Sequence, residues 1–176
     1  TPIKSSAASD VYKRQTSPIL VHLLGEIDEQ TNKNRNLISE IILMVQYEVA
    51  KRIVATNESH SKDYGLLSIL CNFWAETEVL EKVPASAFYP KPKVDSALVR
   101  LRVRETPLFK LDDPKKFRRV IKGAFAMRRK TLVNSLSSSG FSKERIKSAL
   151  MELGFSENIR AENLSIEDFK NLAQKL

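Results

Sequence analysis

The sequence predicts an α/β fold: the second half of an open, Rossmann-like sheet, followed by a small all-α C-terminal domain. Three observations support this fold class. Over residues 16–104, apolar runs of helical and strand length follow one another in the order helix, strand, helix, helix, strand, strand. Over residues 105–176, apolar positions recur at helical spacing. All five glycines are isolated, which indicates that the glycine-rich, cofactor-binding half of such a sheet is missing from this sequence.

Positive charge is concentrated toward the C-terminus. Lysine and arginine exceed aspartate and glutamate by 29 − 21 = 8 overall, and residues 105–176 hold 15 of these cations against 9 anions. Such an excess favours a polyanionic partner, because phosphate contacts supply most non-specific nucleic-acid affinity. Charge alone leaves RNA, DNA and an anionic membrane surface as alternatives.

Composition disfavours several other classes of protein. The single cysteine, Cys71, excludes an intrachain disulfide and fits a reducing compartment. His22 and His60 are isolated and form no metal-ligand pattern, so no metal is expected. No apolar run reaches the roughly 18 residues of a membrane span. We therefore expect a cytoplasmic protein without a membrane partner. We also expect a monomer, although composition does not bear on the oligomeric state.

The chain opens with a segment that has no regular pattern. Residues 1–15 show no hydrophobic period and mix serines with charges of both signs, so we expect them to be unstructured. An apolar, helix-like run then extends to Leu24, with Ser17 as N-cap and Pro18 at the first helical position. This helix begins the predicted α/β part, which covers residues 16–104.

The middle of the α/β part alternates strands and helices. Glu40–Gln46 is a compact apolar run of strand length, and its continuity predicts a strand buried on both faces. It passes into a helical pattern over residues 47–55. A polar turn over residues 59–65 precedes a second apolar helix over residues 66–75. Another short strand is expected over residues 77–83, which leaves too few strands to close a sheet.

The segment from Phe88 to Arg104 joins an aromatic, proline-stiffened loop to an alternating strand. Pro90 and Pro92 fix φ and disfavour helical conformation in the preceding residues, so the loop is expected to stay open. From Ser96 onward, apolar residues alternate with a side that carries three arginines, which predicts one buried and one basic face. A rigid loop that presents an aromatic ring beside lysines suits stacking on a flat ligand next to phosphates. The alternative is a proline-rich connection at a sheet edge, with Phe88 in the core.

Residues 105–176 form the predicted helical domain, whose most basic segment is Lys115–Lys130. This segment holds eight Lys/Arg and no acidic residue. Apolar residues from Phe117 to Phe125 recur at i, i+3, i+4, i+7 and i+8, which places the cations on the remaining face and at the helix end. Solvated faces usually mix signs, so a face of one sign favours phosphate binding. Alternatively, part of the excess complements the C-terminal end of the helix dipole.

Two further helices complete the predicted helical domain. Ser142 is expected to cap the first, which Gly154 ends. Ser165 is expected to cap the second, with Asp168 at the capping-box position. We interpret the apolar stripes of both helices as core.

Four runs of the sequence together resemble the KsgA/RsmA-type ribosomal RNA adenine dimethyltransferases. The first is the loop Phe88-Tyr89-Pro90-Lys91-Pro92-Lys93-Val94-Asp95-Ser96-Ala97 with its following strand. The second is the helix start Ser17-Pro18-Ile19-Leu20. The third joins Met44–Arg52 with Ser61–Ser68, and the fourth is the box Phe125–Leu132. The resemblance covers residues 16–176, about the later half of a family member.

The resemblance implies a fold, a reaction and a partner. The fold is the second half of an S-adenosylmethionine-dependent methyltransferase sheet with a helical RNA-binding domain. Family members transfer methyl groups from S-adenosylmethionine to N6 of two adjacent adenines near the 3′ end of small-subunit rRNA. The expected partner is this rRNA or the immature small ribosomal subunit. By the match, Phe88 stacks on the target adenine. The expected RNA contacts are Lys91, Lys93, Arg118, Arg119, Lys122, Arg128, Arg129 and Lys130.

The sequence departs from the family at its catalytic Asn-Leu-Pro-Tyr motif. In register, Asp10-Val11-Tyr12-Lys13 stand in its place, so the catalytic Asn and Tyr are absent and residues 1–15 are expected to be foreign to the family. We expect no cofactor-binding residues in this chain and no activity from it alone. Two alternatives stay open. One is a non-catalytic RNA- or DNA-binding module, like the mitochondrial transcription factors related to this family. The other is a fragment that folds poorly, because half a sheet leaves an edge unpaired.

Overall fold

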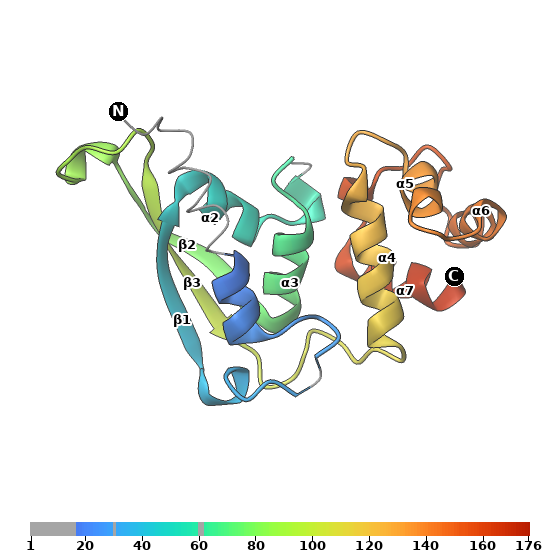
Figure 1. The fold of residues 1–176 in the computed structure, drawn as a ribbon, viewed down its shortest axis with the longest axis horizontal. Coiled ribbons are helices and arrows are strands. Elements are labelled where there is room, and N and C mark those ends of the chain that lie inside the picture. Colours follow the sequence, from blue (N-terminus) through green and yellow to red (C-terminus); the bar gives the residue numbers. More distant parts are fainter. Residues whose placement is uncertain (1–16, 30, 60–61) are drawn as a thin grey trace, which may run out of the picture. The chain divides into compact units, whose positions relative to one another are not determined.

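The computed structural model describes residues 17–29, 31–59 and 62–176, which form two compact units (Figure 1). The sheet unit contains the described residues up to Val54 together with Leu70–Leu108. The helical unit contains Ala55–Ile69 together with Phe109–Leu176. The segment of residues 1–15, predicted to be unstructured and foreign, lies outside the described residues.

The segment Ala55–Ile69 belongs to the helical unit, whereas the sequence-based division after residue 104 placed it in the α/β part. The reason is aromatic packing. Tyr64 is buried, and its ring meets that of Phe125 at a centroid distance of 5.9 Å and an interplanar angle of 80°, a favoured edge-to-face arrangement. Phe125 in turn packs against Phe169 at 5.7 Å. Contacts distant in sequence therefore decide where this segment lies.

The sheet has three antiparallel strands in the order β1-β3-β2. They are β1 (Glu40–Gln46), β2 (Ala75–Val83) and β3 (Ser96–Val103). In the register, Leu43 of β1 and Val79 of β2 flank Val99 of β3. All three strands predicted from the sequence are thus present, and β2 starts two residues earlier than expected.

Helical segments cover one face of the sheet (Figure 1). Residues 17–24 are helical, and α2 (Tyr47–Val54) follows β1 directly. α3 (Leu66–Trp74) runs straight into β2 and ends at the buried Trp74. The guanidinium of Arg35 lies 3.5 Å from the centroid of the Trp74 ring and donates to the carbonyl of Leu24 at 2.8 Å. These contacts hold the loop after the first helix against the core. Short 3-10 turns lie in the connections: η1 (Arg35–Leu37), η2 (Asn57–Ser59) and η3 (Ala85–Ala87).

The prediction that β1 is buried on both faces is wrong. Ile41 and Val45 are buried, whereas Ile42 and Met44 on the opposite face are 54% and 53% exposed. Among the described residues, the helices of the sheet unit lie against one face only. Since successive side chains of a strand point to opposite faces, an apolar run buries only every second residue there.

The predicted basic face of β3 is also wrong, because the neighbouring strands supply carboxylates. Arg100 Nη2 lies 2.5 Å from Glu78 Oε1 of β2. Glu40 Oε1 of β1 lies 3.9 Å from Nε of both Arg100 and Arg102. The alternation of the sequence placed the arginines on the correct side of the strand, but that face carries charges of both signs.

The helical unit has four helices of its own with capped N-termini. They are α4 (Pro114–Ala126), α5 (Leu132–Ser138), α6 (Lys143–Glu152) and α7 (Ile166–Lys175), and a 3-10 turn, η4 (Ala161–Asn163), precedes α7. The predicted caps are present: Ser142 accepts from the N–H of Arg145, and Ser165 and Asp168 form a capping box. Each such cap typically stabilises a helix by about 1 kcal/mol.

The last cations of the basic segment follow the helix and are not part of it. The apolar stripe predicted a helix through Phe125, and α4 ends at Ala126, where a turn follows. The N–H of Leu132 donates to the carbonyl of Ile159 at 2.8 Å, and the N–H of Met127 donates to Ser135 Oγ at 3.1 Å. These bonds take the N–H groups that a continuous helix would use, so a new helix starts after Thr131.

Candidate functional site

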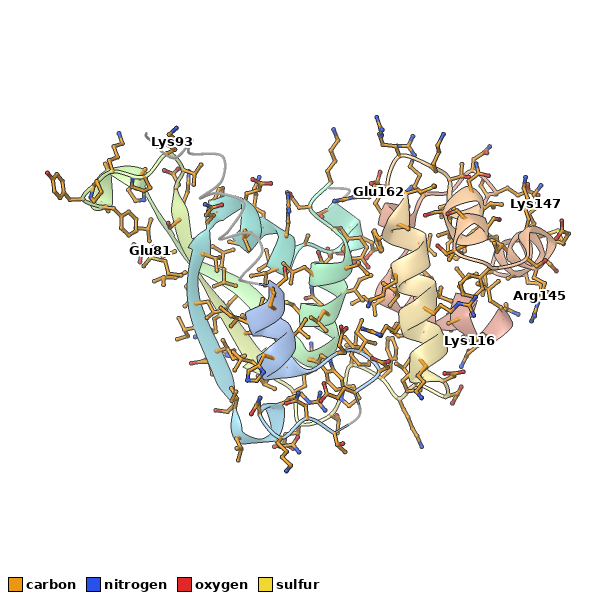
Figure 2. All side chains as sticks on the ribbon, in the orientation of Figure 1. Glu81, Lys93, Lys116, Arg145, Lys147 and Glu162 are labelled. Carbon is orange, nitrogen blue, oxygen red and sulfur yellow. The ribbon has the colours of Figure 1, made fainter. Side chains whose placement is uncertain are left out.

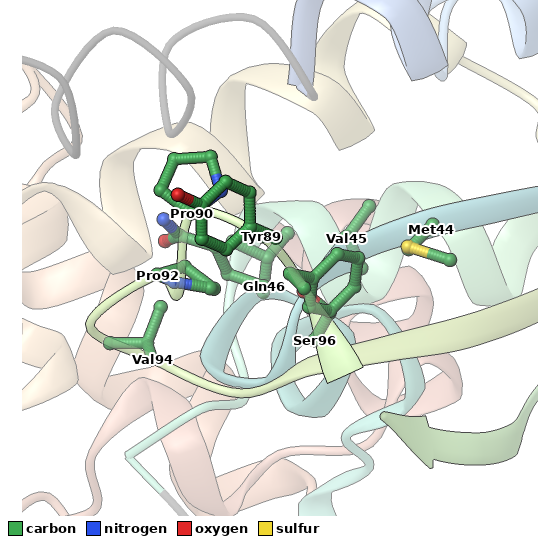
Figure 3. Close-up of a pocket in the computed structure, with 10 residues that line it drawn as sticks. Met44, Val45, Gln46, Tyr89, Pro90, Pro92, Val94 and Ser96 are labelled. Atoms are coloured by element: carbon green, nitrogen blue, oxygen red, sulfur yellow. The ribbon is translucent and has the colours of Figure 1, made fainter. Parts of the chain in front are cut away.

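A cavity of about 510 Å³ lies beside the proline-rich loop of the sheet unit (Figure 3). The end of β1, the start of α2, the loop and the start of β3 all contribute to its lining. The lining residues are Met44, Val45, Gln46, Val49, Phe88, Tyr89, Pro90, Pro92, Val94 and Ser96. The volume is typical of sites for small organic groups, and the mostly apolar walls suit a flat aromatic ring.

Phe88 and Tyr89 present two aromatic rings at this cavity. Phe88 is half-buried and lines the cavity, so it is not a core residue as the alternative interpretation expected. Tyr89 is fully exposed, and the peptide bond between Tyr89 and Pro90 is cis. In Figure 3 the Tyr89 ring lies beside the ring of Pro90. Exposed aromatic faces of this kind are stacking surfaces for nucleobases.

Asp95 holds both ends of the loop. Its Oδ1 accepts from the N–H of Ala85 at 3.0 Å, its Oδ2 pairs with Nζ of Lys82 at 2.9 Å, and its carbonyl accepts from the N–H of Tyr47 at 2.9 Å. The hydrogen bond from Lys82, and next that from Ala85, hold the pKa of the Asp95 carboxyl below its ordinary value. In return, Asp95 raises the pKa of Lys82. The loop that carries Phe88 is therefore tied to β2 and to α2.

Two of the predicted RNA contacts, Lys91 and Lys93, lie exposed on this same loop. Figure 2 shows Lys93 at the loop. The charge of Lys91 also contributes to lowering the pKa of Asp95. The structure thus brings two cations and two aromatic rings together, as the sequence predicted from their proximity along the chain.

The lining of the Phe88 cavity does not fit S-adenosylmethionine. The lining of the Phe88 cavity contains no charged side chain that could pair with the amino-acid part of this cofactor. The sequence also lacks a glycine-rich turn of the type that approaches a nucleoside cofactor. We therefore assign no cofactor contact to this chain.

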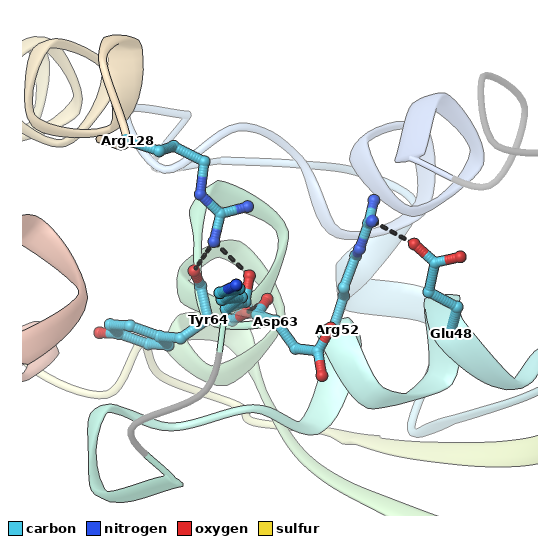
Figure 4. A network of polar contacts seen from close by, with 7 residues as sticks. Glu48, Arg52, Asp63, Tyr64 and Arg128 are labelled. Atoms are coloured by element: carbon cyan, nitrogen blue, oxygen red, sulfur yellow. Dashed lines mark hydrogen bonds and ion pairs between the residues drawn. The ribbon is translucent and has the colours of Figure 1, made fainter.

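Arg128, the first residue of the predicted Arg-Arg-Lys contact, is held by the backbone of its own unit (Figure 4). Its guanidinium donates to the carbonyls of Lys62 and Tyr64, the latter at 3.0 Å. Arg129 and Lys130 are exposed, and within the described ranges their side chains make no hydrogen bond or ion pair. Three adjacent cations therefore differ in what they contact.

Three more predicted contacts lie on α4. Arg118 is half-buried, and Arg119 and Lys122 are exposed. The guanidinium of Arg119 lies 4.6 Å from the centroid of the Phe141 ring, and its Nη2 donates to the carbonyl of Gly140 at 3.4 Å. An arginine stacked on an aromatic ring loses less side-chain entropy when it binds an anion.

Sequence reasoning missed several residues that line cavities. Met44, Gln46 and Val49 line the Phe88 cavity but come from β1 and α2, and the family match over Met44–Arg52 was the only sequence signal for them. Arg145 lines a second cavity in the helical unit. It lies outside the basic segment, so charge clustering along the chain could not identify it.

The described residues do not support a reactive cysteine, a metal site or a membrane-spanning helix. Cys71 is buried, and this burial raises the pKa of its thiol to about 12, which keeps it protonated and unreactive near neutral pH. Over residues 17–29, 31–59 and 62–176, no three His, Cys, Asp or Glu side chains are grouped so that they could hold a metal ion. No helix in this part of the chain is long and apolar enough to cross a membrane.

Residues 7–176 match the family model for ribosomal RNA adenine dimethylase. The chain belongs to the ribosomal RNA adenine dimethylase family. The resemblance inferred from four sequence runs is thus confirmed. The family match begins before Thr16, where the sequence had placed its start, and the segment in register with Asn-Leu-Pro-Tyr lies outside the described residues.

Curated relatives in this adenine dimethylase family are of similar sequence but greater length. The chain is 42% identical over 161 residues to ribosomal RNA small subunit methyltransferase A of Caldanaerobacter subterraneus subsp. tengcongensis, which covers 92% of this chain and 56% of that protein. It is 40% identical to the protein of the same name from Moorella thermoacetica, over 92% of this chain and 52% of that protein. The chain therefore spans about half the length of the curated relatives it matches.

Solved structures agree with the fold class. The crystal structure of a dimethyladenosine transferase from Plasmodium falciparum matches with a TM-score of 0.67 at 24% identity, over 90% of this chain and 62% of that chain. The 23S rRNA methyltransferase ErmE matches with a TM-score of 0.55 at 26% identity, over 79% of this chain and 55% of that chain. The predicted α/β methyltransferase fold class is confirmed.

Proposed function

We propose that this chain forms the base-stacking and RNA-binding part of an S-adenosylmethionine-dependent rRNA adenine dimethyltransferase. The reaction is methyl transfer to N6 of two adjacent adenines near the 3′ end of small-subunit rRNA. The observation that carries this proposal is the cavity at Phe88, where a clamped aromatic loop borders apolar walls. Family membership and the names of the relatives support it. The partner is the small-subunit rRNA or the immature small ribosomal subunit in the cytoplasm, bound by a monomer.

Phe88 positions the target base in this proposal. An adenine amine is a poor nucleophile, because its lone pair is delocalised into the ring, so the flipped base must be held still while the methyl group arrives. The Phe88 ring supplies one stacking face, and Met44 and Val94 add apolar walls to the cavity. Asp95 fixes the loop at both ends and thereby holds the ring in place.

Basic side chains supply phosphate contacts in both units. Lys91 and Lys93 accompany the base on the loop, while Arg129 and Lys130 extend from the helical unit, where Arg118, Arg119 and Lys122 add charge along α4. Arg128 contributes by holding the turn that carries its two neighbours, since its own guanidinium is engaged by backbone carbonyls.

The methyl donor is bound elsewhere in the proposed enzyme. Asn-Leu-Pro-Tyr does not occur in this sequence, and no residue described here is assigned to the cofactor. We therefore expect the 176-residue chain to bind RNA without methylating it.

The decisive experiment replaces Phe88 by Ala in the complete methyltransferase that carries this segment. Loss of the stacking face should lower the methylation rate of immature small subunits by about 100-fold, because a mobile base rarely reaches attack geometry. Binding of the rRNA should stay within about twofold, since phosphate contacts supply most affinity.

Phe88→Tyr is the matched control, because it keeps an aromatic ring and should retain most of the activity. A large loss of rRNA binding with normal turnover would overturn the assignment of Phe88. Methylation that is indifferent to Phe88 would likewise remove this residue from the base-holding role. Strong RNA binding without methylation by the unsubstituted protein would instead favour a non-catalytic binding module.

A further inference from the structure

A second cavity, of about 490 Å³, lies in the helical unit between the start of α4 and the start of α6. Its lining comes from both helices and from the turn before α6. The lining residues are Asp113, Lys115, Lys116, Arg119, Gly140, Phe141, Ser142, Arg145 and Leu176. Figure 2 shows Lys116 on α4 and Arg145 on α6. We call this cavity the α4/α6 cation pocket; it shares no residue with the Phe88 cavity.

Four cationic side chains and one side-chain carboxylate line the pocket. The side chains of Lys115, Lys116 and Arg145 make no ion pair with any carboxylate in the described parts of the chain. The carboxylate, Asp113, is already used as the N-cap of α4, where it accepts from the N–H of Lys116 at 2.9 Å. The lining side chains therefore carry a net positive charge, because four cations face a single side-chain carboxylate.

Arg119 is preorganised at the wall of this pocket. Its guanidinium stacks on Phe141 at 4.6 Å and donates to the carbonyl of Gly140. Gly140 has φ of +87°, a conformation that favours glycine, so it permits the turn whose carbonyl accepts from Arg119. A guanidinium held in this way keeps further N–H donors for an anion.

The N-terminus of α6 is not the donor in this pocket. Ser142 Oγ accepts from the N–H of Arg145, and the Ser142 hydroxyl donates to Glu144 at 2.9 Å. The Glu144 carboxylate also accepts from its own backbone N–H, which lowers its pKa. Since these groups satisfy one another, an anion would be bound by the four cationic side chains.

We propose that the α4/α6 cation pocket binds the phosphodiester backbone of the RNA, at a place separate from the base held at Phe88. Flexible lysines and a stacked arginine suit phosphate oxygens. Contacts to phosphate do not distinguish one base from another, so this contact is independent of the RNA sequence. Arg119 already occupies one face of the Phe141 ring, so we assign the pocket to phosphate and not to a stacked base. The inference rests on the proposed RNA partner.

The test measures RNA binding by the 176-residue chain with two pocket charges removed, Lys115→Gln with Arg145→Gln. A fluorescein-labelled single-stranded RNA from the 3′ end of small-subunit rRNA serves as probe in fluorescence anisotropy, over a series of KCl concentrations. Losing two phosphate contacts should reduce the slope of log K against log [KCl] by about 1.4 and weaken binding about tenfold.

Two control variants separate a specific site from overall charge. Lys33→Gln with Lys110→Gln removes the same charge from exposed lysines outside the pocket and should change affinity by less than about twofold. Lys115→Arg with Arg145→Lys keeps the charge and should retain wild-type binding. Thermal melting of every variant checks the fold. Should the double variant not melt cooperatively, the single variants carry the same test with half the change in slope.

The outcomes distinguish this inference from the proposed function. Equal affinity and slope in the pocket variant and in the Lys33/Lys110 control, with strong binding by the wild type, would overturn the pocket and leave the RNA partner intact. Absence of RNA binding by the wild type would overturn both. Binding to anionic lipid vesicles in place of RNA would likewise overturn both, because the cations would then serve a membrane surface.

Discussion

The β3 strand and the α4/α6 cation pocket are both rich in cations, yet their surroundings differ. On the sheet, Arg100 meets Glu78, and Arg104 Nη1 lies 2.9 Å from Glu76. In the helical unit, Lys115 and Arg145 have no carboxylate partner among the described side chains. The same residue types therefore form a neutralised ladder in one region and a positive cavity in the other.

This difference shows that the net charge of a surface depends on the side chains of both neighbouring elements that form it. Arg100 stands directly opposite Glu78 in the register of β3 and β2, so strand pairing decides its partner. Beside α4, the neighbouring helix contributes Arg145 to the shared cavity and adds positive charge. A basic pattern along one element therefore predicts an anion-binding surface only when the neighbouring element supplies no carboxylates that pair with its cations.

The largest effect on stability should come from the run Arg128-Arg129-Lys130. It contains one cation that is hydrogen-bonded within the protein, Arg128, and two that are exposed. Arg128→Ala removes the donor to the carbonyls of Lys62 and Tyr64 and should lower the free energy of unfolding by about 1–2 kcal/mol. Arg129→Ala removes no such hydrogen bond, so its free energy of unfolding should stay within about 0.5 kcal/mol of the wild-type value. Urea denaturation of both variants measures the contrast.

RNA binding should show the opposite order for this pair. Arg129→Ala should weaken binding and lower its salt dependence, because the side chain is available to phosphate. Equal stability of the two variants would contradict the structural role assigned to Arg128, whereas unchanged RNA binding by Arg129→Ala would remove this residue from the proposed contacts.

A smaller effect should accompany the arginine ladder of β3. Arg100→Gln should lower the free energy of unfolding by no more than about 1 kcal/mol, because ion pairs near the surface contribute little. It should leave the salt dependence of RNA binding unchanged, since Glu78 already neutralises this charge. A double-mutant cycle with Glu78→Gln isolates the coupling of the pair. A weaker salt dependence of RNA binding in Arg100→Gln would contradict the contrast between the two regions, because it would show that RNA contacts the sheet face.

The smallest effect concerns acid stability at the loop clamp. The pKa of Asp95 is lower in the folded state, so its contribution to stability is complete above the unfolded pKa and is lost as the pH falls below about 4. Asp95→Asn should therefore flatten the dependence of Tm on pH in this window. Glu152→Gln is the counterpart in the helical unit, because Lys175 lowers the pKa of Glu152.

The two carboxylate variants should differ in what they do to the Phe88 loop. Fluorescence of 2-aminopurine at the target adenine position of the RNA probe reports stacking on an aromatic ring. Asp95→Asn should reduce the quenching of this fluorophore, whereas Glu152→Gln should leave it unchanged. Identical behaviour of both variants would show that the clamp does not position Phe88.

Much of the candidate site could be predicted because it is local. Phe88, Lys91 and Lys93 occur within one short loop, so their proximity follows from the chain itself. The other walls of the cavity, Met44 and Val49, come from an earlier strand and helix. No periodicity in the sequence connects these segments, so their meeting could be anticipated only through the resemblance to a family.

By itself, the sequence determined the features that depend on neighbours a few positions apart. The strands, the caps at Ser142 and Ser165, and the side of β3 that bears arginines follow from periodicity and from side chains that reach the nearest N–H groups. The tertiary structure alone decided the exposure of Met44, the pairing of Arg100 and the place of Arg145 beside α4. These depend on which distant segment packs alongside, because burial and electrostatic interactions are set by distance in space.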